Sequence, residues 1–433
     1  MIKRLPKSVL EATRNICGQL EHLPKLEEMF RACFTNTLET TTEILGDGTA
    51  YVFTGDIPAL WLRDSSAQVH HYLPFAKDDK EMAFIIEGLL KRQMKYVLID
   101  SYANAFNKEP NGKCCNKDVT KMSPWVWERK YEIDSLCYPV WLAYLYWKET
   151  KKISIFDSNT KKAINKILAV WKIEQKHSER SSYTFLRLIK GREYKVLYNN
   201  GEGMPVNYTG MSWSGFRPSD DAGTFGYNIP GNMFASVVLG YINEIAIHVY
   251  RDNDMAEESL DLKYEIERGI NTYGIYNHPE YGKIYAYETD GFGNYNIMDD
   301  ANVPSLLSIP YLGYVKAEDS VYTNTRRFVL SSDNSCFFKG KYAKGIGSPH
   351  TKKGNIWPIA LIMQALTSID NKEIRNILQM LLQTDGDTGY MHESFNPDNP
   401  KDFSRPWFAW ANSLFAELII RISKNTNFLR EIK

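Results

Sequence analysis

Residues 207–250 read NYTGMSWSGFRPSDDAGTFGYNIPGNMFASVVLGYINEIAIHVY, a long decorated loop that runs directly into an apolar helix. The loop, 207–232, mixes glycines, aromatics, acids and an arginine, and a connection of this length without secondary structure is typically functional. The following stretch, 232–250, is apolar on most faces, which suits a helix surrounded by other helices. This unit decides the fold, because the chain repeats it.

Five further segments of similar composition each run into an apolar helical stretch, and plainer helices lie between them. They are residues 55–64, 123–134, 290–304, 345–355 and 388–407. Such an alternation is expected of a closed ring of helical hairpins whose decorated loops gather at one end. The sequence therefore predicts an all-α fold, an (α/α)6 barrel with its active site in the loops at one end, built as a single catalytic domain over residues 1–433.

Helical periodicity predicts the individual elements of this ring. The expected helices are 7–20, 24–42, 65–76, 80–99, 133–150, 160–178, 232–250, 255–273, 304–316, 323–332, 356–369, 371–384 and 408–424. Residues 183–189, 193–198 and 283–288 alternate in polarity and predict small β-hairpin insertions. No linker or low-complexity stretch suggests a second domain.

The composition excludes several classes of partner. Lys+Arg and Asp+Glu both number 52, so no net field attracts nucleic acid or an acidic membrane surface. An aromatic fraction of 13% fits sugar stacking, although core packing could also explain it. We expect a small, neutral ligand, no nucleic-acid or membrane partner, and a monomer.

Cysteine spacing and apolar runs bear on cofactors and compartment. The six cysteines lack the paired spacing of a zinc site, and we interpret them as reduced thiols. The N-terminal residues lack the apolar block of a signal peptide. The longest apolar run, 233–250, contains Asn243 and Glu244 and falls short of a clean membrane span. We therefore expect a cytoplasmic protein.

The first decorated loop carries Trp61, Arg63 and Asp64, an arrangement that can grip adjacent sugar hydroxyls. The alternative is an ion pair plus a helix cap. The second loop holds several acids, among them Glu132, some of which must be caps or first-turn acids. Clustered acids and Asn302 in the fourth loop could bind calcium, but their spacing does not match an EF-hand, and a helix cap before a proline explains them better.

The third and sixth loops supply candidate catalytic carboxylates. The third contains Asp220 and Asp221 among Trp213, Phe216, Phe225 and Tyr227, whose flat faces could stack on sugars. The sixth contains Glu393 and Arg405. Glycoside hydrolysis needs one protonated and one ionised carboxyl group, and Asp220 or Asp221 with Glu393 could provide them. The residues alone do not choose between the two neighbouring aspartates, and a capped turn also explains them.

Several motifs together resemble glycoside hydrolase family 125, the exo-α-1,6-mannosidases. The resemblance rests on segments such as GDIPALWLRDSSAQV (55–69), FRPSDDA (216–222), GSPHTKKGNIWP (347–358) and HESFN (392–396), and it spans about residues 25–424. It implies an (α/α)6 barrel and hydrolysis of terminal α-1,6-linked mannose with inversion, without a metal or other cofactor.

The resemblance also assigns residues. It implies Asp220 as general acid and Glu393 as general base, with Arg63 and Asp64 gripping the terminal mannose. Further expected sugar contacts are Trp61, Glu132, Asp221, His278, Asn302, His350 and Arg405. The substrate would be a mannose-containing oligosaccharide or N-glycan fragment.

Competing interpretations remain open at the level of sequence. They are another inverting glycosidase on the same barrel, a disaccharide phosphorylase, a histidine-dependent sugar epimerase, a metal-dependent mannosidase and a catalytically inert sugar-binding protein. Phosphate dependence, a histidine pair, loss of activity in a chelator, or absence of turnover would distinguish them.

Overall fold

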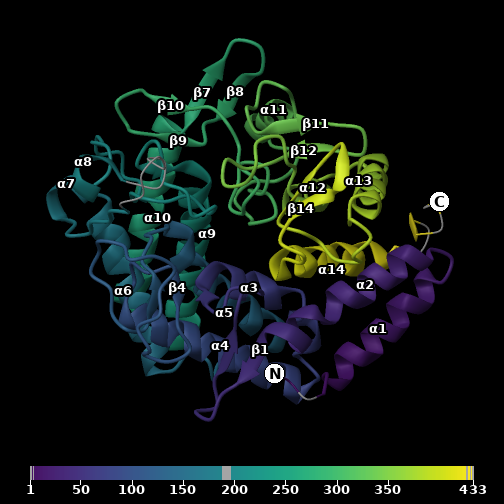
Figure 1. Ribbon diagram of the computed structural model, residues 1–433. Helices are drawn as coiled ribbons and strands as arrows, with labels where there is room; N and C mark the ends of the chain where they lie inside the picture. Colours follow the sequence, from purple (N-terminus) through teal and green to yellow (C-terminus); the bar gives the residue numbers. More distant parts are fainter. Residues whose placement is uncertain (1, 3, 188–196, 426–427, 430, 432–433) are drawn as a thin grey trace.

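The structure is a computed structural model that describes all residues except 1, 3, 188–196, 426–427, 430 and 432–433. It is mostly helical (Figure 1). The helices are α1 Lys7–Leu20, α2 Pro24–Asn36, α3 Leu62–His70, α4 Lys80–Ile99, α5 Ile133–Thr150, α6 Ser158–Glu174, α7 His177–Arg180, α8 Tyr198–Gly201, α9 Ile229–Ile245, α10 Asn253–Tyr273, α11 Ser320–Val329, α12 Pro358–Leu366, α13 Asn371–Gln383 and α14 Ala409–Ser423.

The strands are short and form small sheets between the helices. They are β1 Thr42–Ile44, β2 Ala50–Val52, β3 Leu60–Trp61, β4 Ala105–Phe106, β5 Val126–Glu128, β6 Tyr227–Asn228, β7 Ile275–His278, β8 Gly282–Tyr285, β9 Glu288–Thr289, β10 Tyr295–Asn296, β11 Phe337–Lys339, β12 Lys344–Ile346, β13 Ser394–Asn396 and β14 Asn399–Ser404. Antiparallel pairs such as β3–β4–β5 and β6–β9–β10 join decorated loops to one another.

Two sets of helices alternate along the chain. In the inner set, α3 packs on α5, α5 on α9, α14 on α3, and α12 on α14. In the outer set, α2 packs on α14, α10 on α9, and α13 on α12. Buried apolar side chains between the two sets form one cluster that extends from Val9 to Leu429.

The two sets begin differently. The outer helices α4, α6, α10, α11 and α13 each start after an aspartate whose carboxylate accepts backbone N–H groups of the first turn. Of the inner helices, α9 is capped by Asn228, whose side chain accepts the Gly231 N–H at 2.8 Å, whereas α3, α5, α12 and α14 have no side-chain cap. Each follows a decorated loop, so their N-terminal N–H groups and positive dipole ends lie next to those loops.

One predicted helix is wrong. Residues 304–316 form a run of turns and contain no helix. Pro304 and Pro310 lack the N–H that a helix needs, and the Asp299 carboxylate accepts the N–H groups of Leu306 and Leu307 at 2.8 and 3.0 Å. Local side-chain hydrogen bonds therefore replace the helical ladder in this inner position.

The three segments predicted as small hairpins differ in the structure. Residues 283–288 contribute to β8 and β9, and β8 pairs with β7 in a hairpin. In 183–189 the described residues make only an isolated bridge between Val119 and Leu186, and residues 188–189 lie outside the description. Most of 193–198 also lies outside the described residues.

One helix among the described residues, Ile229–Tyr250, is long and apolar enough to cross a membrane by length and composition. It comprises α9 and the π-helical turn Ala246–Tyr250, and half of its most apolar window is buried within the fold. This is the pattern of a core helix in the inner set. All six cysteines are free thiols.

Candidate active site

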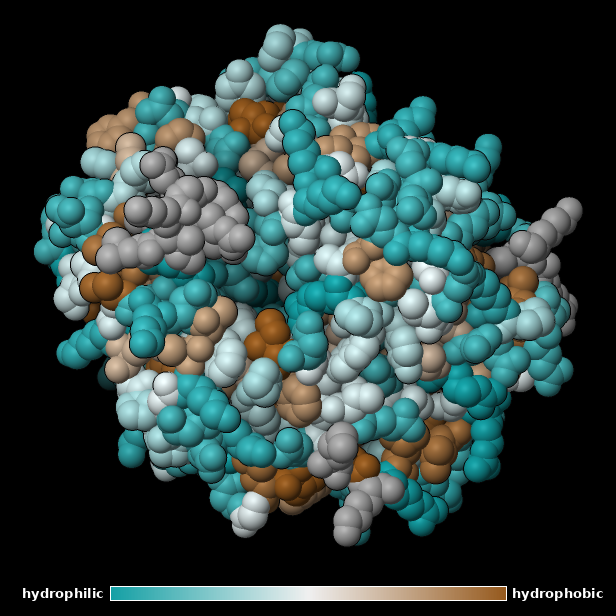
Figure 2. Space-filling model, in the orientation of Figure 1, coloured by the Kyte–Doolittle hydropathy of each residue, from teal (hydrophilic) through white to brown (hydrophobic). Residues whose placement is uncertain are grey.

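A pocket of about 220 Å³ opens at the end of the molecule where the decorated loops meet. Figure 2 shows this face hollowed near its centre. The lining residues come from the first, third, fourth, fifth and sixth loops: Thr54, Asp56, Ile57, Trp61, Arg63, Asp64, Pro218, Ser219, Asp220, Asn302, His350, Trp357, Glu393, Arg405, Phe408 and Trp410. The fold thus gathers polar side chains from distant parts of the sequence into one cavity.

Asp220 enters the pocket from a tight hairpin turn. Its backbone N–H donates to the Arg217 carbonyl at 2.9 Å, and the Arg217 N–H donates to the Asp221 carbonyl at 2.8 Å. Asp220 itself has φ 65°, in the left-handed region that aspartate tolerates better than most residues. This is the hydrogen-bond pattern of a three-residue loop with a bulge at Asp220. The turn makes the side chain of Asp220 project into the cavity.

Arg217 holds this turn from behind. Its guanidinium donates to both carboxylate oxygens of Glu288, at 2.6 and 3.0 Å, and to the Thr224 hydroxyl at 3.1 Å. Glu288 also accepts the Thr224 backbone N–H at 3.1 Å. Arg217 does not line the pocket and instead acts as a bidentate anchor for the loop.

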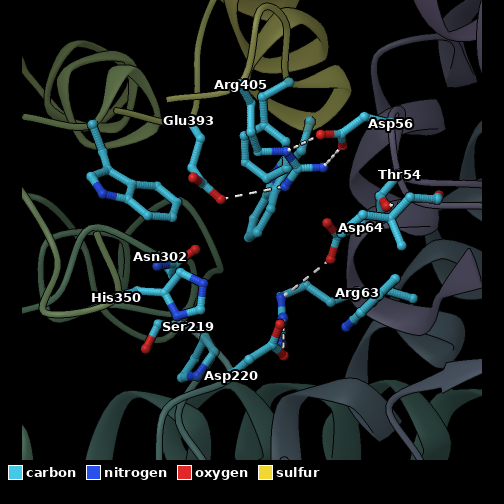
Figure 3. Close-up of a pocket in the computed structure, with 16 residues that line it drawn as sticks. Thr54, Asp56, Arg63, Asp64, Ser219, Asp220, Asn302, His350, Glu393 and Arg405 are labelled. Atoms are coloured by element: carbon cyan, nitrogen blue, oxygen red, sulfur yellow. Dashed lines mark hydrogen bonds and ion pairs between the residues drawn. The ribbon is translucent and has the colours of Figure 1, made fainter. Parts of the chain in front are cut away.

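Glu393 lies on the wall opposite Asp220 (Figure 3). Its carboxylate accepts the Ser404 hydroxyl at 3.0 Å and Arg405 Nη1 at 3.4 Å. Arg405 also pairs with Asp56 of the first loop. These two donors hold the Glu393 carboxylate at the wall of the cavity.

Arg63 forms the floor of the pocket, and its guanidinium lies among four carboxyl groups. It donates to Glu132 at 2.6 Å, Asp134 at 3.1 Å and Asp220 at 3.3 Å, while its Nε lies 3.5 Å from Asp64. Asp64 lines the cavity, and burial raises its pKa to about 6, against the opposing effect of Arg63. Glu132 and Asp134 lie behind Arg63 and do not line the pocket.

Asp220 and Glu132 influence each other's charge. Burial alone would raise the pKa of Asp220, but Lys130, a hydrogen bond from Glu132, Arg63 and His350 together lower it below the usual range. Burial raises the pKa of Glu132 well above its usual range, and the charge of Asp220 raises it further. These opposite pKa shifts favour the proton on Glu132 and the charge on Asp220.

His350 and Asn302 complete the side of the pocket shown at the left of Figure 3. His350 Nδ1 lies 3.1 Å from Asp221 Oδ1. The Asn302 amide nitrogen donates to Asp300 Oδ1 at 3.1 Å, which fixes its orientation. Asp221 does not line the cavity, but its carboxylate contacts His350, which does.

The aromatic lining differs from the prediction. Trp61, Trp357, Phe408 and Trp410 line the pocket. The third-loop aromatics that we expected to stack on sugars, Trp213, Phe216, Phe225 and Tyr227, do not line it. Trp213 is 1% exposed and stacks on His177 at a ring distance of 3.6 Å, so it supports the loop as part of the core.

Two other expected sugar contacts are not at the pocket. Glu132 is 0% exposed, so a sugar in the cavity cannot reach it. His278 lies at the end of β7, where its Nδ1 accepts the Glu280 N–H at 3.2 Å and its ring packs against Tyr281 and Phe328. A turn-forming role at the β7–β8 hairpin explains this histidine.

Sequence reasoning missed several residues that shape the site. Asp56, Ser219 and Phe408 line the pocket, and Asn104 donates to Asp220 at 3.0 Å. Asp56 lies in the first loop, which also carries the candidate residues Arg63 and Asp64. Its place in that loop could therefore have identified it as a site residue. Asn104 precedes β4 and had no local motif, because only the pairing of β4 with β3 brings it behind Asp220.

In the described part of the chain, no group of three or more His, Cys, Asp or Glu side chains is arranged to hold a metal ion. The fourth-loop acids instead serve the backbone: Asp299 accepts two N–H groups of the following turns and Asp290 accepts the N–H groups of Phe292 and Asn294. The calcium hypothesis for this loop therefore finds no support.

Comparisons with known proteins identify the family of this chain. A family profile described as metal-independent alpha-mannosidase (GH125) matches residues 23–420. A solved Streptococcus pneumoniae structure from a family of metal-independent alpha mannosidases, in a non-productive substrate complex with alpha-1,6-mannobiose, is 48% identical. It covers 97% of this chain and 99% of its own, with a TM-score of 0.94.

More distant comparisons fit the same picture. The meiotically up-regulated gene 157 protein of Schizosaccharomyces pombe is 41% identical over 437 residues, which cover 96% of this chain and 85% of that protein. Glucoamylase from Saccharomycopsis fibuligera is 12% identical with a TM-score of 0.58, covers 94% of this chain and 96% of its own, and shows likeness of fold alone. The chain belongs to the GH125 family of metal-independent alpha-mannosidases, which are glycoside hydrolases.

Proposed function

We propose that this mannosidase is exo-acting and hydrolyses non-reducing terminal α-1,6-linked mannose with inversion, releasing β-mannose from mannooligosaccharides or N-glycan fragments. One observation carries the proposal: Asp220 and Glu393 face each other across a single pocket (Figure 3). The relative bound to alpha-1,6-mannobiose supports the choice of linkage.

In this mechanism, Asp220 protonates the departing glycosidic oxygen while Glu393 removes a proton from the attacking water. The water attacks the anomeric carbon from the face opposite the leaving oxygen. Inversion requires the carboxyl groups to stand about 6.5–9.5 Å apart, against about 5–5.5 Å for a retaining pair. The donors Ser404 and Arg405 orient the carboxylate that would act as the general base.

Exo action is supported by the closed floor of the pocket. Arg63, Asp64 and Trp410 form that floor and are 2%, 6% and 2% exposed, with their remaining surfaces packed into the protein. The Arg63 guanidinium also lies over the Trp410 ring, 5.8 Å from its centroid. A chain that entered this cavity could not pass through it, so only a terminal sugar would reach Asp220.

We also infer that the helices form an (α/α)6 barrel. The alternation of inner and outer helices supports it, with the turn segment 304–316 taking an inner position. Tyr311 of that segment donates to Glu417 of α14 at 2.9 Å. A crystal structure in which this segment lay outside the ring would contradict the assignment.

The proposed activity is tested by incubating the protein with α-1,2-, α-1,3- and α-1,6-linked mannobioses and following the released anomer by NMR. We expect release from the 1,6 isomer, first as β-mannose, without dependence on phosphate. Release of α-mannose would overturn inversion, and a requirement for phosphate would favour a phosphorylase.

A further inference from the structure

Behind Asp220 lies a buried cluster of ionisable side chains in which acids outnumber bases. Within the described residues it contains six carboxyl groups and three cations linked by ion pairs and by the amide of Asn104: Asp64, Asp118, Glu128, Glu132, Asp134 and Asp220, with Arg63, Lys130 and Arg187. Like charges in a poorly solvated interior cannot all ionise, so such a cluster retains protons.

The proton nearest to the chemistry lies between Glu132 and Asp220. Arg63 holds their carboxyl groups next to each other, because it donates to Glu132 at 2.6 Å and to Asp220 at 3.3 Å. The single amide nitrogen of Asn104, whose oxygen accepts the Lys130 backbone N–H, contacts both of them, at 3.2 Å to Glu132 and 3.0 Å to Asp220. An ionised carboxylate is only an acceptor, so a hydrogen bond between two carboxyl groups requires that one carries a proton.

The surroundings place that proton on Glu132 when the pocket is empty. The side chain of Glu132 is 0% exposed, whereas that of Asp220 is 22% exposed to solvent. Charge is least costly on the more solvated partner. The Ser135 hydroxyl at 2.8 Å and Arg63 at 2.6 Å contact Glu132 through one oxygen, Oε2. Its other oxygen remains available to share the proton.

We propose that Glu132 stores the proton used in catalysis, keeping it while the pocket is empty and transferring it to Asp220 when a sugar occupies the pocket. The inference rests on the proposed function, in which Asp220 is the general acid. Glu132 acts through Asp220 and does not touch the substrate.

The driving force is the loss of water around Asp220. A bound sugar covers the exposed part of that side chain, which disfavours its charge, while its glycosidic oxygen accepts a hydrogen bond only from the neutral acid. Glu132 keeps its contact with Arg63 and is stabilised as the carboxylate after it gives up the proton. The pair then behaves as one titrating unit with two apparent pKa values.

The protons balance over one turnover. The proton moves from Glu132 to Asp220 and then to the glycosidic oxygen, which receives the electron pair of the breaking bond to the anomeric carbon. Glu393 takes one proton from the attacking water and releases it to solvent. One proton from solvent then restores the pair through the exposed Asp220.

Several charged groups face Glu132 and set this equilibrium. On α3 they are Arg63 and Asp64, on α5 Asp134, on the strand side Glu128, Lys130 and Arg187, and on the hairpin turn Asp220, with His350 beyond it. Among the carboxyl groups of this set, Asp220 shares the Asn104 amide with Glu132 and also lines the pocket.

The test is the pH profile of Glu132→Gln. Glutamine keeps the shape and an oxygen for Arg63, but it has no proton to give and no charge to repel the Asp220 carboxylate. Asp220 beside Arg63 and Lys130 would then lose its proton at lower pH. We expect the basic limb of kcat/KM to shift down by about one pH unit or more, with about a tenfold loss of activity for each unit above it.

Asp134→Asn is the matched control. Asp134 is not one of the two carboxyl groups that share the proton. It contacts the same Arg63 nitrogen as Glu132, at 3.1 Å, and is equally buried. Loss of this carboxylate perturbs Arg63 in the same way without removing a partner of Asp220. A shift as large in Asp134→Asn as in Glu132→Gln would overturn the proposal, because it would reflect charge removal in general.

Two further measurements keep the proposal separate from the proposed function. If Asp220→Asn keeps full activity on mannobiose, the acid assignment itself fails. If Asp220→Asn is inactive and Glu132→Gln has an unchanged pH profile, only the present inference fails.

Infrared spectra of the wild-type protein, which need no variant to fold, should show a protonated carboxyl band at neutral pH that shifts when mannose binds. An unshifted spectrum overturns the proton transfer.

Discussion

The Asp221 carboxylate and the His350 imidazole lie 3.1 Å apart, from Oδ1 to Nδ1. An ionised Asp221 accepts the Nδ1 proton and thereby fixes the tautomer of the His350 imidazole. Asp220, whose backbone is in the left-handed region, lines the pocket, whereas its neighbour Asp221 does not. Asp220 projects into the pocket, and Asp221 orients a histidine on its wall.

Asp221→Asn should therefore lower kcat/KM without abolishing activity. An amide can still contact His350 but no longer holds one tautomer through a charged acceptor, and hydrogen bonds to charged groups contribute about 1.5–3 kcal/mol. We expect kcat/KM for α-1,6-mannobiose to fall about 10- to 100-fold. Steady-state kinetics of this variant, His350→Ala and the double variant should show strongly non-additive losses. Additive losses would show that the two residues act independently.

Asp220→Asn and Asp220→Ala should differ in stability although both lack the acid. Asparagine tolerates the left-handed conformation at φ 65°, whereas alanine is strained there by about 1–2 kcal/mol. Both should lose at least about 10²-fold in kcat on mannobiose, the usual contribution of a general acid. Thermal unfolding should place the alanine variant lower. Equal melting temperatures would argue against strain at this position.

Glu393→Gln should be inactive on every substrate, because attack by water needs the base whatever the leaving group. An aryl mannoside with a good leaving group needs little protonation, so it should rescue Asp220→Asn but not Glu393→Gln. Measuring the turnover of such a substrate in each variant separates the role of the acid from that of the base. Rescue of Glu393→Gln alone would reverse the assignment.

The fold was largely predictable because helical periodicity and punctuating loops are local signals. The failure at 304–316 has a physical cause, since Asp299 accepts N–H groups seven and eight residues later and replaces helical hydrogen bonds. A pattern of apolar residues contains no information about such a side-chain competitor. By contrast, an aspartate cap visible in the sequence marks the start of α4, α6, α10, α11 and α13.

The site was predictable only where function shows in residue type. Asp220, Glu393, Arg63 and Asp64 occur in distinctive loops, and the structure brings them to one pocket. The sequence could not distinguish Trp213, a core residue, from Trp410, a pocket residue, because stacking and packing use the same aromatic faces. Burial depends on tertiary contacts, and these also decide that Glu132 lies behind the floor.

Gly55→Ala should impair substrate binding at the mouth of the pocket. Gly55 has φ 124°, and a Cβ there would lie 2.9 Å from the Trp407 ring, between the Asp56 and Arg405 loops that are paired across the mouth. We expect KM to rise about threefold or more through displacement of these loops. Gly48→Ala is the control: it also has a positive φ, 76°, but its Cβ would meet nothing within 4 Å. A similar KM in both variants would exclude the contact with Trp407.

His71→Phe should make the protein more resistant to acid. His71 is 4% exposed and packs against Phe34 and Tyr72 at the end of α3, and burial lowers its pKa to about 3. In the unfolded chain a histidine titrates near about 6.5, so between these values the unfolded state binds more protons.

The wild-type protein should accordingly lose stability as the pH falls from about 6.5 toward about 3, by up to about 1.4 kcal/mol per pH unit from this residue. A phenylalanine of similar size has no proton to bind, so the free energy of unfolding should depend less steeply on pH in this range. Urea unfolding at several pH values measures the slope, and replacement of the exposed His248 serves as the control. If both variants had the wild-type slope, protonation of His71 would not drive acid unfolding.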